Sequence, residues 1–199
     1  MISNQEPQQI KVVVIGDSSV GKTSILLTYT QDRFPIDYVP TVFENYSNVI
    51  SVDNTQVQLT LWDTAGQESY ERLRMISYQA ANAFVIVFSV IDLQSFENIW
   101  IKWLPELQKA GKDRLPKIII GNKCDKLNDS LKFQVFWEKC ELENIRFIEC
   151  SAFQNKNIKN VFEEIVSITI REQMLQTVLR SKRRQETIQK QQKSFCQLL

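Results

Sequence analysis

A glycine-containing loop directly follows an apolar run near the start of the chain. The run is Ile10–Ile15, and the loop reads GDSSVGKT from Gly16 to Thr23. Two glycines five residues apart, followed by Lys-Thr, have the spacing of a loop that binds phosphate. Gly16 and Gly21 permit backbone angles that turn the amides between them inward, and a helix beginning near Lys22 adds the positive end of its dipole. The loop therefore predicts a phosphate site in which Lys22 reaches the β- and γ-phosphates and the Thr23 hydroxyl ligates Mg²⁺.

The segment LWDTAGQE, Leu61–Glu68, lies at the end of an expected strand and carries three groups suited to a phosphate. Asp63 can support Mg²⁺ through water, and the Gly66 amide can meet a γ-phosphate. Gln67 is neutral and can orient the water that attacks phosphorus. The segment therefore predicts the hydrolytic part of a nucleotide site.

The segment GNKCD, Gly121–Asp125, follows another expected strand and suits the base of the nucleotide. The carboxylate of Asp125 can accept two hydrogen bonds from the ring nitrogen and the exocyclic amine of guanine, a donor pair that adenine lacks. Such a site rejects the wrong base by about 10⁴ or more, because its carboxylate would be left unpaired. Lys123 can lay its aliphatic stem over the base, and Asn122 can tie this loop to the phosphate loop.

Two further observations support a single nucleotide site. The pair Ser151-Ala152 follows the last expected strand, where its backbone amides would supply the final contact to the base. The chain has five glycines, and four of them lie in these candidate loops: Gly16, Gly21, Gly66 and Gly121. A chance glycine turn at each place is therefore the weaker interpretation.

Short β-type runs alternate with helical patterns along the chain, and the cluster Asp53-Asn54-Thr55 predicts a hairpin. The expected strands are Gln9–Ile15, Tyr46–Val52, Gln56–Trp62, Phe84–Ser89, Lys117–Ile120 and Ile145–Glu149. The expected helices are Lys22–Thr30, a short one after Ser69, Gln94–Lys109, Leu131–Leu142 and one from Asn157 onward. Because most runs are apolar throughout, the pattern predicts an α/β fold with a mostly parallel sheet covered on both faces.

The charge is unevenly spread along the 199 residues, whose formal net charge is +1. Six basic residues and one acidic residue follow position 179, so that this end carries +5 and the rest −4; the six are Arg180, Lys182, Arg183, Arg184, Lys190 and Lys193. The length fits one domain with an extension, and the basic end predicts an anionic partner. The stretch Arg180–Ser194 is expected to be solvated and flexible.

Several function classes are excluded by composition. The chain has no histidine, which removes Ser-His, Cys-His and His-metal chemistry. Its four cysteines match neither a metal site nor a disulfide framework. The start lacks the apolar core of a signal peptide, and the longest apolar run is too short to cross a membrane. A reducing, cytosolic setting is expected.

Taken in order, GDSSVGKT, Thr41, DTAGQE, NKCD and SA resemble the motifs of the Ras superfamily of small GTPases, from about Ile10 to Arg171. The stretches YVPTVFENY, LWDTAGQESYERLR and FVIVFSVIDLQSFENIWIKWLPEL are similar to the Rho family rather than to Ras, Rab or Arf proteins. The resemblance implies a P-loop GTPase fold with a six-stranded, mostly parallel sheet and helices on both faces. It also implies a GTPase domain over 1–172 and a basic tail over 173–199.

The resemblance implies a set of residues that bind GTP or GDP with Mg²⁺. They are Gly16, Ser18, Ser19, Val20, Gly21, Lys22, Thr23, Ser24, Phe34, Tyr38, Thr41, Asp63, Gly66, Asn122, Lys123, Asp125, Ser151 and Ala152. The implied metal ligands are Thr23, Thr41 and Asp63, and the implied catalytic residues are Gln67, Lys22 and Thr41.

Two switch segments are implied, Phe34–Tyr46 and Thr64–Tyr78. Thr41 would sense the γ-phosphate, Tyr38 would close over the phosphates, and Phe34 would pack edge-on against guanine. The γ-phosphate would order both segments. Exchange factors, GTPase-activating proteins, a dissociation inhibitor and effectors would read these surfaces.

The chain departs from the Rho pattern at three places. Rho proteins usually carry a helical insert after the NKxD motif, but 25 residues separate Asp125 from Ser151, which leaves room for one loop and one helix. Phe153 stands where the family usually has Lys, so the rigidity of the base loop is expected to differ. Ser18 stands where many Rho and Ras proteins have Gly, on the path of an activator's arginine finger, and is expected to slow hydrolysis modestly.

The chain ends Cys196-Gln197-Leu198-Leu199, which fits a prenylation motif whose last residue predicts geranylgeranylation of Cys196. Because stable anchoring takes two signals, the basic residues are expected to add about 1 kcal/mol each at an anionic leaflet. The expected protein is a lipid-anchored monomer on the cytoplasmic face of the plasma membrane. Nucleic acid is not expected, because the body shows no aromatic–basic platform.

Three alternatives stay open beside a Rho-like switch that signals to the actin cytoskeleton. The first is an interaction module that holds GTP constitutively, against which Gln67 argues. The second is a Rab-like trafficking GTPase, suggested by Ser18-Ser19 but not by the tail. The third is an ATP-using kinase or ATPase, against which Asp125 argues.

Overall fold

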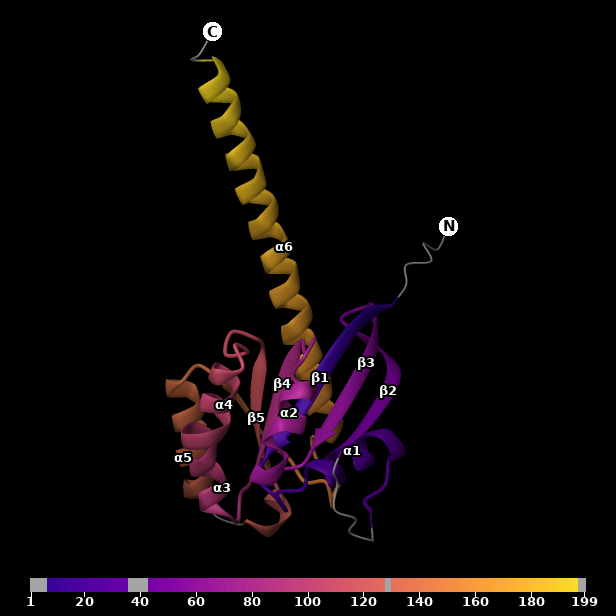
Figure 1. Ribbon diagram of the computed structural model, residues 1–199. Helices are drawn as coiled ribbons and strands as arrows, with labels where there is room; N and C mark the ends of the chain where they lie inside the picture. The colour runs from indigo at the N-terminus through magenta and orange to yellow at the C-terminus, as the bar shows by residue number, and fades with distance from the viewer. Residues whose placement is uncertain (1–6, 36–42, 128–129, 197–199) are drawn as a thin grey trace.

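A computed structural model describes residues 7–35, 43–127 and 130–196. Its six strands form one sheet in the order β2-β3-β1-β4-β5-β6 (Figure 1). They are β1 Gln8–Gly16, β2 Phe43–Val52, β3 Thr55–Thr64, β4 Ala83–Ser89, β5 Lys117–Asn122 and β6 Arg146–Glu149. Only β2 is antiparallel to its neighbour, and the predicted hairpin joins it to β3. The predicted α/β fold is confirmed.

The helices lie on both faces of this sheet and each face has its own core. They are α1 Lys22–Gln31, α2 Glu71–Ser77, α3 Leu93–Asn98, α4 Leu104–Lys109, α5 Ser130–Leu142 and α6 Ile158–Cys196, with short helical turns η1 Glu68–Tyr70, η2 Ile99–Trp103 and η3 Cys124–Lys126. Successive residues of β1 alternate between the cores: Val12 and Val14 pack toward α1 and α6, and Val13 and Ile15 toward α3–α5. This alternation follows from the period of two along a strand.

The helix expected over Gln94–Lys109 is one continuous stretch with a change of winding in its middle. Its start is capped by Asp92, whose carboxylate accepts the Ser95 amide at 3.3 Å. The central segment η2 is π-helical, a widening that is frequent at functional sites. It places Trp103 fully inside the core.

The stretch Arg180–Ser194, expected to be solvated and flexible, is part of α6, which runs without a break to Cys196. Figure 1 shows this part of α6 extending beyond the sheet. No Gly or Pro occurs within α6, and its outer part is rich in Gln, Lys and Arg, which favour helix. Ile170 is the last buried side chain among those described, so the helix continues there on local preference. The domain division at 172–173 stays a prediction.

Within the described residues, α5 is the one α-helix between β5 and β6, as expected for a chain without the inserted helix. No helix in the described part of the chain has the length and apolar character needed to cross a membrane. Ligands of open α/β sheets bind at the carboxyl ends of the parallel strands. The ends of β1, β3, β5 and β6 and the loops after them carry most of the predicted site residues, so the fold brings these residues to one edge.

Candidate functional site

The loop between β1 and α1 adopts a shape that its two glycines allow. Gly16 has φ +142° and Gly21 has φ +98°, angles that side chains rarely adopt. A Cβ at Gly16 would lie 2.1 Å from the Val87 carbonyl oxygen, and one at Gly21 would lie 2.3 Å from the amide nitrogen of Asn122. Neither position therefore tolerates a larger residue. Ser19 between them also has a left-handed φ of 63°.

Lys22 lies inside this loop and is only 6 % exposed. Its ammonium donates to the carbonyl oxygens of Gly16 at 2.9 Å and Asp17 at 2.7 Å. Burial lowers its pKa from 10.5 to about 8, although Asp63 and Asp17 act in the opposite direction. A cation desolvated in this way gains from any anion that enters the loop.

The predicted metal ligands Thr23 and Asp63 lie side by side. The Thr23 hydroxyl donates to the Asp63 carboxylate at 2.5 Å, and Asp63 is fully buried. The register that pairs Val14 with Asp63 brings the ends of β1 and β3 together. Hydroxyl and carboxylate oxygens are ligands suited to Mg²⁺, so this donor set fits the ion. Thr41, the third predicted ligand, and Tyr38 lie outside the described residues.

The loop after β3 presses directly on the phosphate loop. A Cβ at Gly66 would lie 2.4 Å from the carbonyl carbon of Asp17 and 2.5 Å from the amide nitrogen of Ser18. Gly66 is buried, whereas the next residue, Gln67, is exposed. This contact brings Gln67 to the border of the phosphate loop, where its predicted role requires it.

The side chains of Asn122 and Lys123 link the base loop to the phosphate loop, and the link through Asn122 was predicted. The amide nitrogen of Asn122 donates to the Val20 carbonyl at 2.9 Å, and its oxygen accepts the Ala152 backbone amide at 3.2 Å. The Lys123 ammonium donates to the Ser19 carbonyl at 2.7 Å, and burial lowers the pKa of Lys123. The two loops therefore behave as one unit.

The predicted base acceptor Asp125 is oriented by a residue whose side-chain role the sequence did not indicate. The Ser151 hydroxyl donates to the Asp125 carboxylate at 2.5 Å, and Ser151 is fully buried. The backbone amides assigned to base contact make bonds within the protein: that of Ser151 to the Lys156 carbonyl at 3.1 Å, and that of Ala152 to Asn122. Their contact with the base stays a prediction.

An aromatic pair joins the end of the α1 region to the base loop. The rings of Phe34 and Phe153 meet edge to face, with centroids 5.4 Å apart and planes at 82°. Both remain partly open, at 39 % and 68 % exposure. The unusual Phe153 thus contacts the residue predicted to pack against guanine.

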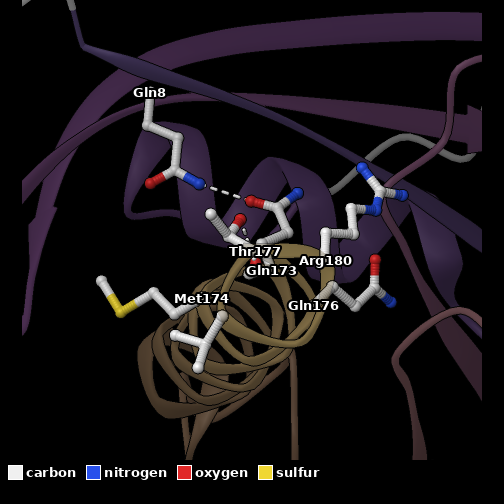
Figure 2. Close-up of a pocket in the computed structure, with 7 residues that line it drawn as sticks. Gln8, Gln173, Met174, Gln176, Thr177 and Arg180 are labelled. Carbon is white, nitrogen blue, oxygen red and sulfur yellow. Dashed lines mark hydrogen bonds between the residues drawn. The ribbon is translucent and has the colours of Figure 1, made fainter. Parts of the chain in front are cut away.

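A hollow of about 670 Å³ lies at the opposite end of β1, away from these loops. Figure 2 shows its lining, in which the Gln8 side chain reaches from the start of β1 to Gln173 on α6. Glutamine amides, Met174 and Val178 dominate it. It holds none of the predicted site residues.

Comparison with known proteins agrees with this geometry. The family model described as "Ras family" matches residues 11–171. The chain is 42 % identical over 167 residues to the Ras-like GTP-binding protein RhoL of Drosophila melanogaster, covering 81 % of this chain and 87 % of that protein. It is 40 % identical over an alignment of 210 residues to the Rho-related protein racC of Entamoeba histolytica, covering 98 % and 100 %.

The chain is a small GTPase of the Rho family. As such it binds GTP and GDP with Mg²⁺ and is a GTP hydrolase. Rho GTPases generally interact with exchange factors, GTPase-activating proteins and effectors. In this Rho GTPase the structure brings together the described residues of the predicted site, whose individual roles remain predictions.

Proposed function

We propose that this GTPase hydrolyses GTP with Gln67, Lys22 and Thr41 and acts as a switch at membranes. The observation that carries the catalytic part is the contact of Gly66 with Asp17 and Ser18. This contact leaves Gln67 beside the loop that would hold the γ-phosphate. An attacking water could then approach from the Gln67 side.

The protein's own residues would each do one task in the reaction. Thr23, Asp63 and Thr41 would hold Mg²⁺, which would supply neutralisation of phosphate charge. Lys22 would exchange its two carbonyl partners for phosphate oxygens and stabilise charge on the leaving group. The amide side chain of Gln67 would orient the water, and the Gly66 amide would bind a γ-phosphate oxygen.

Guanine selectivity would come from Asp125. Ser151 fixes the carboxylate by a hydrogen bond of 2.5 Å, so its orientation does not depend on the ligand. Because the carboxylate is already oriented, little free energy is lost to its reorganisation when guanine binds. A base without the matching donors leaves the carboxylate unpaired.

Single-turnover hydrolysis of GTP by the full chain tests the catalytic proposal. We expect phosphate release from the wild type in Mg²⁺ and a rate at least tenfold lower, to order of magnitude, for Gln67→Leu. Equal rates for both proteins would contradict the role of Gln67. GTP that is bound by the wild type but never cleaved would support the constitutively GTP-bound module instead.

We extend the proposal to the C-terminal part of the chain, where Cys196 would carry a geranylgeranyl group. Arg180, Lys182, Arg183 and Arg184 would supply the second signal at the cytoplasmic face of the plasma membrane. Fractionation of cells that express the protein tests this: Cys196→Ser should move it from membranes to the soluble fraction. An unchanged membrane share would contradict the lipid anchor.

The partners would read switch I, Phe34–Tyr46, and switch II, Thr64–Tyr78, on a monomeric protein, with effectors of the actin cytoskeleton. A pull-down with GTP-loaded and GDP-loaded protein tests this. Formin or kinase effectors bound to the GTP form would support actin signalling, and vesicle-tethering factors would favour the Rab-like alternative.

A further inference from the structure

A buried arginine outside the predicted site holds the backbone around Gly66. Arg74 of α2 is 2 % exposed. One of its terminal nitrogens, Nη1, donates to the carbonyl oxygens of Ala65 at 3.0 Å and Gln67 at 2.6 Å. These two carbonyls flank Gly66, so one guanidinium fixes the chain on both sides of it.

The other two nitrogens of Arg74 bind a carboxylate on α4. Nε and Nη2 donate to the two oxygens of Glu106 at 3.0 Å and 2.8 Å, and the Tyr78 hydroxyl donates to the same group at 2.5 Å. The side chain of Glu106 is 9 % exposed. Burial by itself would lower the pKa of Arg74, but Glu106 outweighs it and raises that pKa. The fork is bidentate and stays charged.

The guanidinium of Arg74 is also connected to the phosphate loop, through the indole of Trp103. The Arg74 guanidinium lies over the Trp103 ring, 5.1 Å from its centroid. Trp103 Nε1 donates to one carboxylate oxygen of Asp17 at 2.8 Å, and Asn98 donates to the other at 2.5 Å. Arg74 therefore connects the Gln67 loop, helix α4 and the phosphate loop.

Peptide planarity turns these contacts into a constraint on the site. The Ala65 carbonyl and the Gly66 N–H belong to one trans peptide, so they point in opposite directions. When Arg74 holds the carbonyl, the N–H points away from Arg74. The Gln67 carbonyl is held as well, so the Gly66–Gln67 segment is restrained at both of its ends.

We propose that Arg74, supported by Glu106, is a positioning residue that aims the Gly66 amide and Gln67 for hydrolysis. The proposal rests on the proposed role of Gln67. Lysine cannot replace Arg74, because one ammonium cannot span a carboxylate and two carbonyls in a planar fork. The hydrogen bonds of Arg74 go to Ala65, Gln67 and Glu106, so its direct effect is expected on the Gln67 loop and on hydrolysis rather than on nucleotide binding.

Single-turnover hydrolysis and GDP release by the full-length Arg74→Lys variant test the proposal. We expect hydrolysis to slow by about tenfold or more, because small misplacements near the reacting atoms are costly, and GDP release to change by less than about twofold. The matched control is Arg146→Lys, another Arg–Glu pair whose arginine is 61 % exposed, which should leave both rates unchanged. Unchanged hydrolysis in Arg74→Lys would overturn the proposal.

A second variant, and a test in a protein that already carries Gln67→Leu, distinguish a positioning role of Arg74 from a general loss of structure. Glu106→Gln keeps the size of the side chain and removes its charge, and should slow hydrolysis by about threefold, even where Arg74→Lys does not fold. In a Gln67→Leu background, Arg74→Lys should cause no further slowing of hydrolysis. An additional tenfold slowing, to order of magnitude, would overturn positioning through Gln67. If Gln67→Leu alone hydrolyses normally, it is the proposed function that fails.

Discussion

The phosphate half of the site and the base half are built in different ways. The phosphate half, Gly16–Thr23 with Asp63 and Gly66, depends on places where no side chain fits, because a Cβ at each of its glycines would meet neighbouring atoms at 2.1–2.4 Å. The base half, Asn122–Asp125 with Ser151–Phe153, depends on side-chain hydrogen bonds. The first is therefore sensitive to added volume and the second to lost donors and acceptors.

Asn122 belongs to both halves, since its amide binds the Val20 carbonyl and its oxygen binds the Ala152 amide. The comparison therefore predicts which substitutions affect one half alone and which affect both. Four changes test it, from the largest expected effect to the smallest.

Asp125→Ala should break the base half alone. We expect GDP affinity to fall by about 10⁴, because the paired donors of guanine lose their acceptor, while weak binding of inorganic tripolyphosphate stays the same. Competition against fluorescent GDP measures the first, and calorimetry the second. The exposed Glu141→Ala is the control. A parallel loss of tripolyphosphate binding would show that the halves are not separable.

Asn122→Ala should weaken both halves. The Val20 carbonyl and the Ala152 amide would lose a buried partner, so we expect the free energy of unfolding to fall by about 2–4 kcal/mol, measured by denaturant titration. The exposed Asn160→Ala serves as the control and should change it by less than about 0.5 kcal/mol. If Asn122→Ala lowered the free energy of unfolding by less than about 0.5 kcal/mol as well, the two loops would not depend on each other.

The pKa of Lys22 predicts a pH dependence that belongs to the phosphate half. Burial places that pKa at about 8 in the nucleotide-free protein, and phosphate oxygens would raise it. Above pH 8 the free protein then holds fewer protons than the complex, so GDP affinity should fall by about tenfold per pH unit. Titration from about pH 7 to pH 9 tests this.

Lys22→Arg is the control for this pH dependence, because arginine stays charged throughout the range. Its affinity should be flat from about pH 7 to pH 9. A flat profile in the wild type would contradict the low pKa of Lys22, and a steep one in Lys22→Arg would assign the titration to another group.

Phe153→Leu tests the smallest effect, on the rim of the base half. The edge-to-face pair with Phe34 contributes beyond the area it buries, so GDP release should become about threefold faster. Stopped-flow release of a fluorescent GDP measures the rate. If Phe34→Leu speeds release and Phe153→Leu does not, the pair itself contributes nothing.

Sequence reasoning predicted the parts of the site that local motifs determine. Gly16, Lys22, Thr23, Asp63 and Asn122 lie where the spacing places them, because strand–loop–helix units carry them to one edge of the sheet. Local motifs also predicted the strands, and the apolar runs of β1, β4 and β5 are buried on both faces.

The sequence did not indicate contacts between residues far apart in the chain. Arg74 and Glu106 are 32 positions apart, and Asp17 and Trp103 are 86 apart. No periodicity or motif links such pairs, since only the packing of α2 against β3 and of η2 against β1 brings them together. The helical outer part of α6 was not predicted for a different reason: its polar composition was interpreted as a solvated, flexible stretch, although its residues favour helix.

The central claim is that the two halves form one guanine-specific site, and competition for labelled GDP tests it most directly. Full-length protein loaded with fluorescent GDP in Mg²⁺ would be challenged with GTP and, separately, with ATP. The account predicts displacement by GTP at equal concentration and none by ATP at about a thousandfold excess. Displacement by ATP at a concentration comparable to GTP would contradict it.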